Sequence, residues 1–178
     1  FFTSSTQPIT NLQATGLTGA DLPWTPRLFR NTVSGFEDVT NASQMNVPLQ
    51  CVSVVAGDFD NDGDLDLYFV CRGGAQNLPN RLFENQGDGT FFEVGATGAA
   101  GPIGFNVAQG AGTGESVAVA DVDLDGFLDL FVTNGLNMQP VDYGGPNQLF
   151  RNLGNSNNWI LRDLVGVQSN RDAVGAKV

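Results

Sequence analysis

The sequence predicts an all-β chain made of propeller-type blades, each with four antiparallel strands, that together form a partial propeller. Three observations predict this fold. The 178 residues include 23 glycines and many Asn and Asp residues, which favour tight turns. Two strand–loop–strand segments repeat 63 residues apart, starting at Asp58 and Asp121. Gly and Asn interrupt every window of about 12 residues, which argues against helices.

The repeat is visible as two motifs. The segment Gly57–Val70 (GDFDNDGDLDLYFV) aligns with Ala120–Thr133 (ADVDLDGFLDLFVT). A second motif follows each of them, as Asn80–Asn85 (NRLFEN) and Asn147–Asn152 (NQLFRN). A shorter copy, Arg27–Asn31 (RLFRN), comes earlier without an acidic loop before it. One unit therefore reads strand, acidic loop, strand, long turn, strand, turn, strand.

The four strands of a unit are expected in that order. The first is predicted at Val52–Ala56 and Ser116–Ala120, and the second at Leu65–Val70 and Leu128–Val132. In the second strand Leu65, Leu67 and Phe69 share one face, and Asp66 points back toward the loop. The third and fourth strands are predicted at Arg81–Glu84 and Thr90–Val94, joined by a run of turn-forming residues.

Nine of the 19 acidic residues lie in the two loops, which share the pattern Asp-x-Asp-x-Asp-Gly-x-x-Asp. Alternate aspartates turn toward one centre, and Gly63 or Gly126 allows the sharp bend. The seventh position offers a backbone carbonyl, and the ninth closes the site. An all-oxygen, highly charged set favours Ca²⁺ over Mg²⁺. The predicted ligands of two calcium ions are Asp58, Asp60, Asp62, Asp64 and Asp66, then Asp121, Asp123, Asp125, Phe127 and Asp129.

Two other structures could explain the acidic loops. An Asp- and Gly-rich stretch is also typical of an exposed turn, but two loops matching at five positions favour metal. Carboxylates this close repel one another, and a bound cation converts that repulsion into folding energy. An EF-hand is excluded, because its twelfth-position glutamate is replaced by Phe69 and Val132.

Composition excludes several functional classes. The net charge is −11 with a single lysine, Lys177, which argues against nucleic-acid binding. The absence of histidine removes Ser-His-Asp and Cys-His catalysis and the usual zinc sites. No apolar run approaches the roughly 20 residues of a membrane span. The start, Phe1 to Ser5, lacks the pattern of a signal peptide, so a secreted protein would already have lost its leader.

The two cysteines, Cys51 and Cys71, lie ten residues on either side of Asn61. If Asn61 is the hairpin centre, the two thiols face each other within reach of a disulfide, and the alternative is a pair of buried free thiols. Gly114 and Asn134 stand at these positions in the later unit.

Other residues have structural interpretations. Asn41 begins the one N-glycosylation sequon, which matters only in a glycosylating source. Trp24 and Trp159 are interpreted as packing residues rather than sugar platforms. A set of phenylalanines is expected to form the core between blades: Phe83, Phe91, Phe92, Phe131 and Phe150.

At these residues the chain resembles the FG-GAP/VCBS repeat, the calcium-loop blade of integrin-type and bacterial β-propellers, over about residues 27 to 165. The stretch Asn158–Val178 resembles the opening of the ASPIC/UnbV region, which follows such repeats in the cartilage acidic protein family. The resemblance implies a secreted or cell-surface protein with a role in cell adhesion or matrix contact.

The expected organisation follows. Residues 1–40 hold an N-terminal segment and the end of a preceding blade, 51–95 a calcium-binding blade, and 96–114 a Gly/Ala-rich loop. Residues 115–165 hold a second calcium-binding blade, and 166–178 begin the ASPIC/UnbV-like region. Since a propeller closes with about four or more blades, other residues or other copies are expected to complete it.

Three functions remain open. The leading hypothesis is a non-enzymatic, calcium-stabilised extracellular module for adhesion or matrix structure, with a protein or glycan partner. A second is a self-assembling subunit of a fibre or ring joined through open blade edges. The third is a hydrolase using paired carboxylates, although the clustered aspartates serve as ligands and the pairs Glu37/Asp38 and Glu84/Glu93 fit a blade surface.

Overall fold

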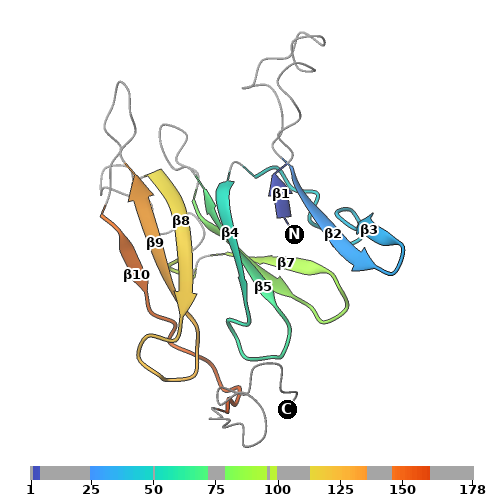
Figure 1. The fold of residues 1–178 in the computed structure, drawn as a ribbon. Coiled ribbons are helices and arrows are strands. Elements are labelled where there is room, and N and C mark those ends of the chain that lie inside the picture. The colour runs from blue at the N-terminus through green and yellow to red at the C-terminus, as the bar shows by residue number, and fades with distance from the viewer. Residues whose placement is uncertain are drawn as a thin grey trace, which may run out of the picture.

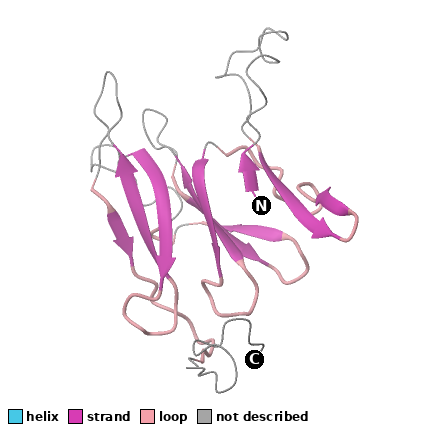
Figure 2. Ribbon diagram, viewed as in Figure 1, coloured by secondary structure: helices cyan, strands magenta, loops and turns pink. Residues whose placement is uncertain are grey.

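A computed structural model describes residues 2–4, 25–49, 51–71, 79–95, 97–99, 113–135 and 146–160. Every regular element in these ranges is a β-strand, and the strands form three antiparallel sheets (Figure 2). The all-β prediction is therefore confirmed. Within the same ranges there is no helix of the length and apolarity that a membrane crossing requires.

The three sheets lie side by side in chain order (Figure 1). The first contains β1 (Phe2–Ser4), β2 (Pro26–Thr32) and β3 (Gly35–Asp38). The second contains β4 (Cys51–Gly57), β5 (Asp66–Cys71), β6 (Arg81–Asn85) and β7 (Phe91–Val94), adjacent in that order. The third has β9 (Asp129–Gly135) between β8 (Thr113–Ala120) and β10 (Gln148–Phe150).

The second sheet is the four-stranded blade that the sequence predicts. One detail of the prediction was wrong: Leu65 lies before β5 and is 59% exposed, whereas Leu67 and Phe69 are buried. The strand begins at Asp66, whose buried carboxylate accepts hydrogen bonds from the backbone N–H groups of Phe59 and Asn85 and so holds this residue in place.

Two strand boundaries also differ from expectation. The strand β1 was not predicted; it pairs with β2, with Phe2 opposite Leu28. In the third sheet β8 starts at Thr113, inside the predicted Gly/Ala-rich loop, because Thr113 and Gly114 pair with Gly135 and Asn134. Both differences arise from pairing between distant segments, which a local pattern does not reveal.

The central strand β5 is buried on both faces, and this strand unites the cores. Leu67 and Phe69 pack with Met45, Leu49 and Phe83 on one side. Tyr68 and Val70 face Leu130 and Val132 of the third sheet on the other. Because successive strand residues point to opposite faces, one strand contributes to both interfaces. The second and third sheets thus pack face to face, as neighbouring blades do.

The disulfide Cys51–Cys71 is confirmed, and the two cysteines are directly opposite each other in the β4–β5 register. Gly114 and Asn134 are likewise opposite in the third sheet. A Cβ at Gly114 would collide with Val70 and lie 3.1 Å from the Cys71 carbonyl oxygen. The later unit therefore needs glycine where the earlier one has cysteine, since this point abuts the bridged blade.

The predicted phenylalanine core is correct for three of its five members. Phe83 is buried, and Phe91 and Phe150 pack against the two core clusters. The prediction was wrong for Phe92 and Phe131, which are 65% and 42% exposed. Each of these two directly follows or precedes an inward-facing residue, so strand alternation turns its ring outward.

Candidate metal centres

The two acidic loops lie next to each other at one end of the second and third sheets. Each connects the first strand of its sheet to the second, and both lie at the lower end of the molecule in Figure 1. The side-chain amide of Asn61 donates a hydrogen bond of 2.9 Å to the carbonyl oxygen of Gly126. Segments about sixty residues apart in sequence thus form one acidic end.

The loops share one backbone conformation. Asn61 and Leu124, at equivalent positions, have φ values of 59° and 61°. Gly63 and Gly126 follow with φ of 99° and 91°. A leucine in the left-handed region is uncommon, so the fold imposes this conformation on the second loop rather than residue preference. The repeat therefore extends from sequence to backbone geometry.

The first aspartate of each loop organises its tip. Asp58 accepts hydrogen bonds of 3.1 Å from the backbone N–H groups of Asp62 and Gly63. Asp121 accepts the same two bonds, from Asp125 at 3.1 Å and Gly126 at 3.0 Å. These bonds curl the backbone around the carboxylate, so that the following aspartates are directed to a common centre.

The last aspartate of each loop joins three segments. Asp66 is 2% exposed and accepts hydrogen bonds from the N–H of Phe59 at 3.0 Å and of Asn85 at 2.9 Å. Asp129, also 2% exposed, accepts hydrogen bonds from the backbone N–H of Val122 at 3.0 Å and of Asn152 at 2.8 Å. Each carboxylate therefore ties its loop to the end of the third strand.

Sequence reasoning missed this role of the third-strand motif. The signal was present, since the motif ends in asparagine at Asn31, Asn85 and Asn152. Besides its backbone N–H, the side-chain amide of Asn152 also donates a hydrogen bond, of 2.7 Å, to the carbonyl oxygen of Phe59 in the first loop. Asn155 and Asn157 both donate to the carbonyl oxygen of Asp60, at 2.7 and 2.8 Å. The segment after β10 thus fastens the first loop.

Burial raises the pKa of Asp66 to about 6, outweighing the backbone donors from Asn85 and Phe59, which lower it. The pKa of Asp60 is also raised, first by burial and then by the charge of Asp62. Carboxyls held in this way gain from a nearby cation, because a positive charge favours their ionised form.

Oxygen atoms of three aspartates converge in each loop. Those of Asp58, Asp60 and Asp62 lie within 4.8 Å of one another, as do those of Asp121, Asp123 and Asp129. Three carboxylates at this spacing suit a hard divalent cation, so the residues fit a calcium ion by the chemistry of their donor set.

Three predicted aspartate ligands, Asp64, Asp66 and Asp125, lie outside these groups, whereas Phe127 is predicted to contribute its backbone carbonyl rather than its side chain. Asp66 lies outside the first group, and the Asp64 carboxylate faces the turn at Gly87. Asp125 forms an ion pair with Arg151, and the Phe127 side chain is buried beside Gly154.

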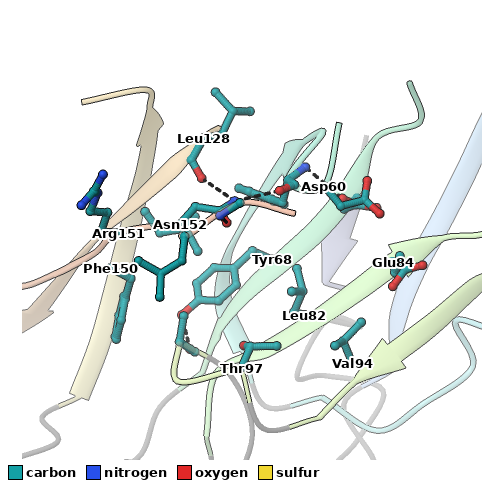
Figure 3. A pocket seen from close by; sticks show the side chains of 16 residues that line it. Asp60, Tyr68, Leu82, Glu84, Val94, Thr97, Leu128, Phe150, Arg151 and Asn152 are labelled. Atoms are coloured by element: carbon teal, nitrogen blue, oxygen red, sulfur yellow. Dashed lines mark hydrogen bonds between the residues drawn. The ribbon is translucent and has the colours of Figure 1, made fainter. Parts of the chain in front are cut away.

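Two clefts flank the loops. One of about 490 Å³ lies between them and is lined by Asp58, Asp121 and Trp159, among others. The Trp159 ring occupies the space beside Gly126, where any Cβ would collide with it. The second cleft, of about 380 Å³, lies between the second and third sheets, with Tyr68 and Leu82 on its walls (Figure 3). Trp24 and residues 166–178 lie outside the described residues.

The carboxylate pairs considered for hydrolysis sit at the surface, and three of the four residues are in ion pairs. Arg30 pairs with Glu37 at 2.8 Å, Arg27 with Asp38, and Arg81 with Glu93. Hydrogen bonds from Thr40, followed by one from Arg27, lower the pKa of Asp38 to about 2. Glu84 accepts a hydrogen bond of 3.3 Å from Gln86.

Comparison with known proteins agrees with this geometry. A family model for the FG-GAP-like repeat matches residues 17–69 and 68–132. Cartilage acidic protein 1 from Mus musculus is 34% identical over 148 residues, which cover 80% of this chain. The proteins of that name from Homo sapiens and Xenopus tropicalis are each 33% identical over 80% of the chain. The chain spans about a fifth of the length of these relatives, namely 21%, 20% and 21%.

Proposed function

Because this chain belongs to the FG-GAP-like repeat family, we propose that it is a calcium-binding extracellular propeller module that serves adhesion or matrix structure. The observation that carries the proposal is the duplicate construction of the acidic loops. Both have the same backbone conformation, the same hydrogen bonds to the first and last aspartates, and three converging carboxylates. Both copies of the repeat keep this arrangement, which is what two cation sites of the same kind require.

An extracellular location is supported by the disulfide, since such bonds persist in oxidising compartments. The names of the relatives refer to cartilage, a matrix-rich tissue, which agrees with this location. The sequon residue Asn41 lies exposed in a turn. A non-enzymatic role is supported by the buried aspartates Asp66 and Asp129, whose carboxylates accept backbone hydrogen bonds.

Isothermal titration calorimetry tests the calcium proposal. The wild-type chain is expected to bind two Ca²⁺ ions and to prefer Ca²⁺ over Mg²⁺, because flexible carboxylate cages suit the larger ion. Asp58→Asn and Asp121→Asn should each reduce the stoichiometry from two to one. Asp88→Asn serves as the control, since Asp88 lies in an exposed turn outside both loops. If the wild-type chain binds no calcium in this titration, the proposal is refuted.

Self-association is a second candidate function, favoured by the outer face of the third sheet. Tyr68 and Leu82 of the second sheet pack in the core shared with the third. Their equivalents in the third sheet, Phe131 and Leu149, are 42% and 55% exposed. Within the described residues that sheet also ends at β10, whereas the second sheet has β7 beyond β6. In the described part of the chain, this combination of an apolar face and an open edge suits another copy of the chain.

Sedimentation velocity in calcium tests the second candidate. The wild-type chain is expected to sediment faster as its concentration rises, and the double variant Phe131→Ser/Leu149→Ser should remain monomeric. Phe92→Ser is the matched control, because it removes an exposed aromatic ring from a different sheet. A wild-type chain that is monomeric at every concentration would exclude self-association through this surface.

A further inference from the structure

The two loops differ in the charge of one neighbouring residue. The third-strand motif places Glu84 before Asn85 in the second sheet, and Arg151 before Asn152 in the third. The N–H groups of Asn85 and Asn152 donate to the closing aspartates at 2.9 and 2.8 Å. Since the anchoring bond is the same, Glu84 and Arg151 occupy equivalent positions with opposite charges.

Arg151 is turned toward the loop of its own sheet. Its guanidinium forms ion pairs with Asp123 and with Asp125, the latter at 3.3 Å. An arginine side chain is not deprotonated in proteins, so the positive charge of Arg151 is permanent. Figure 3 shows Arg151 and Glu84 on opposite sides of the cleft between the two sheets.

Glu84 has the opposite effect on the first loop. Glu84 and Asp60 line the same cleft, so Glu84 places a further negative charge beside the first loop. No arginine approaches Asp58, Asp60 or Asp62 in the ion pairs of the described residues. Among the described residues, the first loop therefore has no positively charged partner, whereas the second has Arg151.

The two groups of converging oxygen atoms reflect this difference. Asp62 belongs to the group in the first loop, but its equivalent Asp125 is absent from the group in the second and pairs with Arg151. With every acid ionised, five aspartates and one glutamate give the first loop a formal charge of −6. Four aspartates and one arginine give the second a formal charge of −3.

We propose that Arg151 is an internal counter-cation of the second loop, so that this loop binds calcium more weakly than the first and fills only when Arg151 releases Asp123 and Asp125. The inference rests on the proposed calcium-binding function. It predicts that the module passes through a state with a single ion as calcium rises. Filling of the second loop then frees the guanidinium beside the cleft that Arg151 lines.

Nuclear magnetic resonance of the full chain during calcium titration resolves the two sites. The amides of Gly63 and Gly126 report on them separately, because each donates to the first aspartate of its own loop. In the wild type, Gly126 is expected to titrate at a calcium concentration about tenfold higher than Gly63, given the difference in ligand charge. Arg151→Gln should move the Gly126 midpoint about tenfold lower and leave that of Gly63 in place.

Two further variants make the test selective. Glu84→Arg places the counter-cation at the first loop and should weaken the Gly63 transition. Arg30→Gln removes the same charge from the β2–β3 hairpin, where Arg30 pairs with Glu37, and should change neither midpoint. If both glycines titrate but Arg151→Gln leaves Gly126 unchanged, the role of Arg151 is refuted while calcium binding stands. If neither glycine responds, the calcium proposal fails and this inference fails with it.

Discussion

Asp66→Ala is expected to destabilise the folded chain by about 3 kcal/mol at neutral pH without calcium, because two buried N–H groups lose their acceptor. These donors are the backbone amides of Phe59 and Asn85, in the loop and at the end of β6. Each unsatisfied buried donor costs about 1–3 kcal/mol. The variant also removes a buried charge whose raised pKa shows that burial disfavours it, which holds the net loss below the sum.

Urea unfolding of Asp66→Ala measures this loss, and Asp62→Ala provides the matched comparison in the same loop. Asp62 is exposed and, among the described residues, accepts a single hydrogen bond, from Asp64. Its replacement should therefore cost no more than about 0.5 kcal/mol without calcium. In calcium, Asp62→Ala should become destabilising relative to the wild type. Equal losses for the two variants in chelator would show that Asp66 has no structural role apart from metal.

Removal of calcium is expected to lower the thermal unfolding midpoint of the wild-type chain by about 10–20 °C. An ion present at about 100 times its dissociation constant stabilises the folded state by about 2.7 kcal/mol, and two such ions by about 5 kcal/mol. That amount is comparable to the whole stability of an ordinary domain, about 5–15 kcal/mol. The cause is the repulsion among the carboxylates of each loop, which the ion neutralises.

Differential scanning calorimetry in calcium and in chelator measures the shift. The double variant Asp58→Asn/Asp121→Asn should show almost none of it, since both loops lose the aspartate that orders their tip. Restoring calcium to chelator-treated wild-type protein should return the midpoint to its original value. A midpoint that does not respond to chelator would contradict a stabilising role for calcium.

Comparison of the sheets with the family matches shows that sequence repeats and blades are out of phase. The matches end at residues 69 and 132, within β5 and β9. One repeat therefore begins with the outer strands of one sheet and ends with the first two strands of the next. Each repeat covalently links two blades, which adds to the packing between Tyr68 and the third sheet.

Local features of this chain could be predicted because they depend on short-range chemistry. The acidic loops, their left-handed glycines and the strands around them follow from turn formers, alternation and charge density within about a dozen residues. The Cys51–Cys71 bridge was predictable for the same reason, since a hairpin centred on Asn61 determines which residues face each other.

The tertiary structure decided what depends on distant segments. Which faces of Phe92 and Phe131 are covered, the pairing of β1 with β2, and the bond from Asn61 to Gly126 all depend on how the sheets stack. The approach of Arg151 to Asp123 depends on the third strand lying beside its loop, 28 residues away along the chain. The sequence alone thus determined the kind of acidic loop and the strands that hold it. Only the stacking of the sheets decided which charges surround each loop, because electrostatic interactions depend on distance in space rather than along the chain.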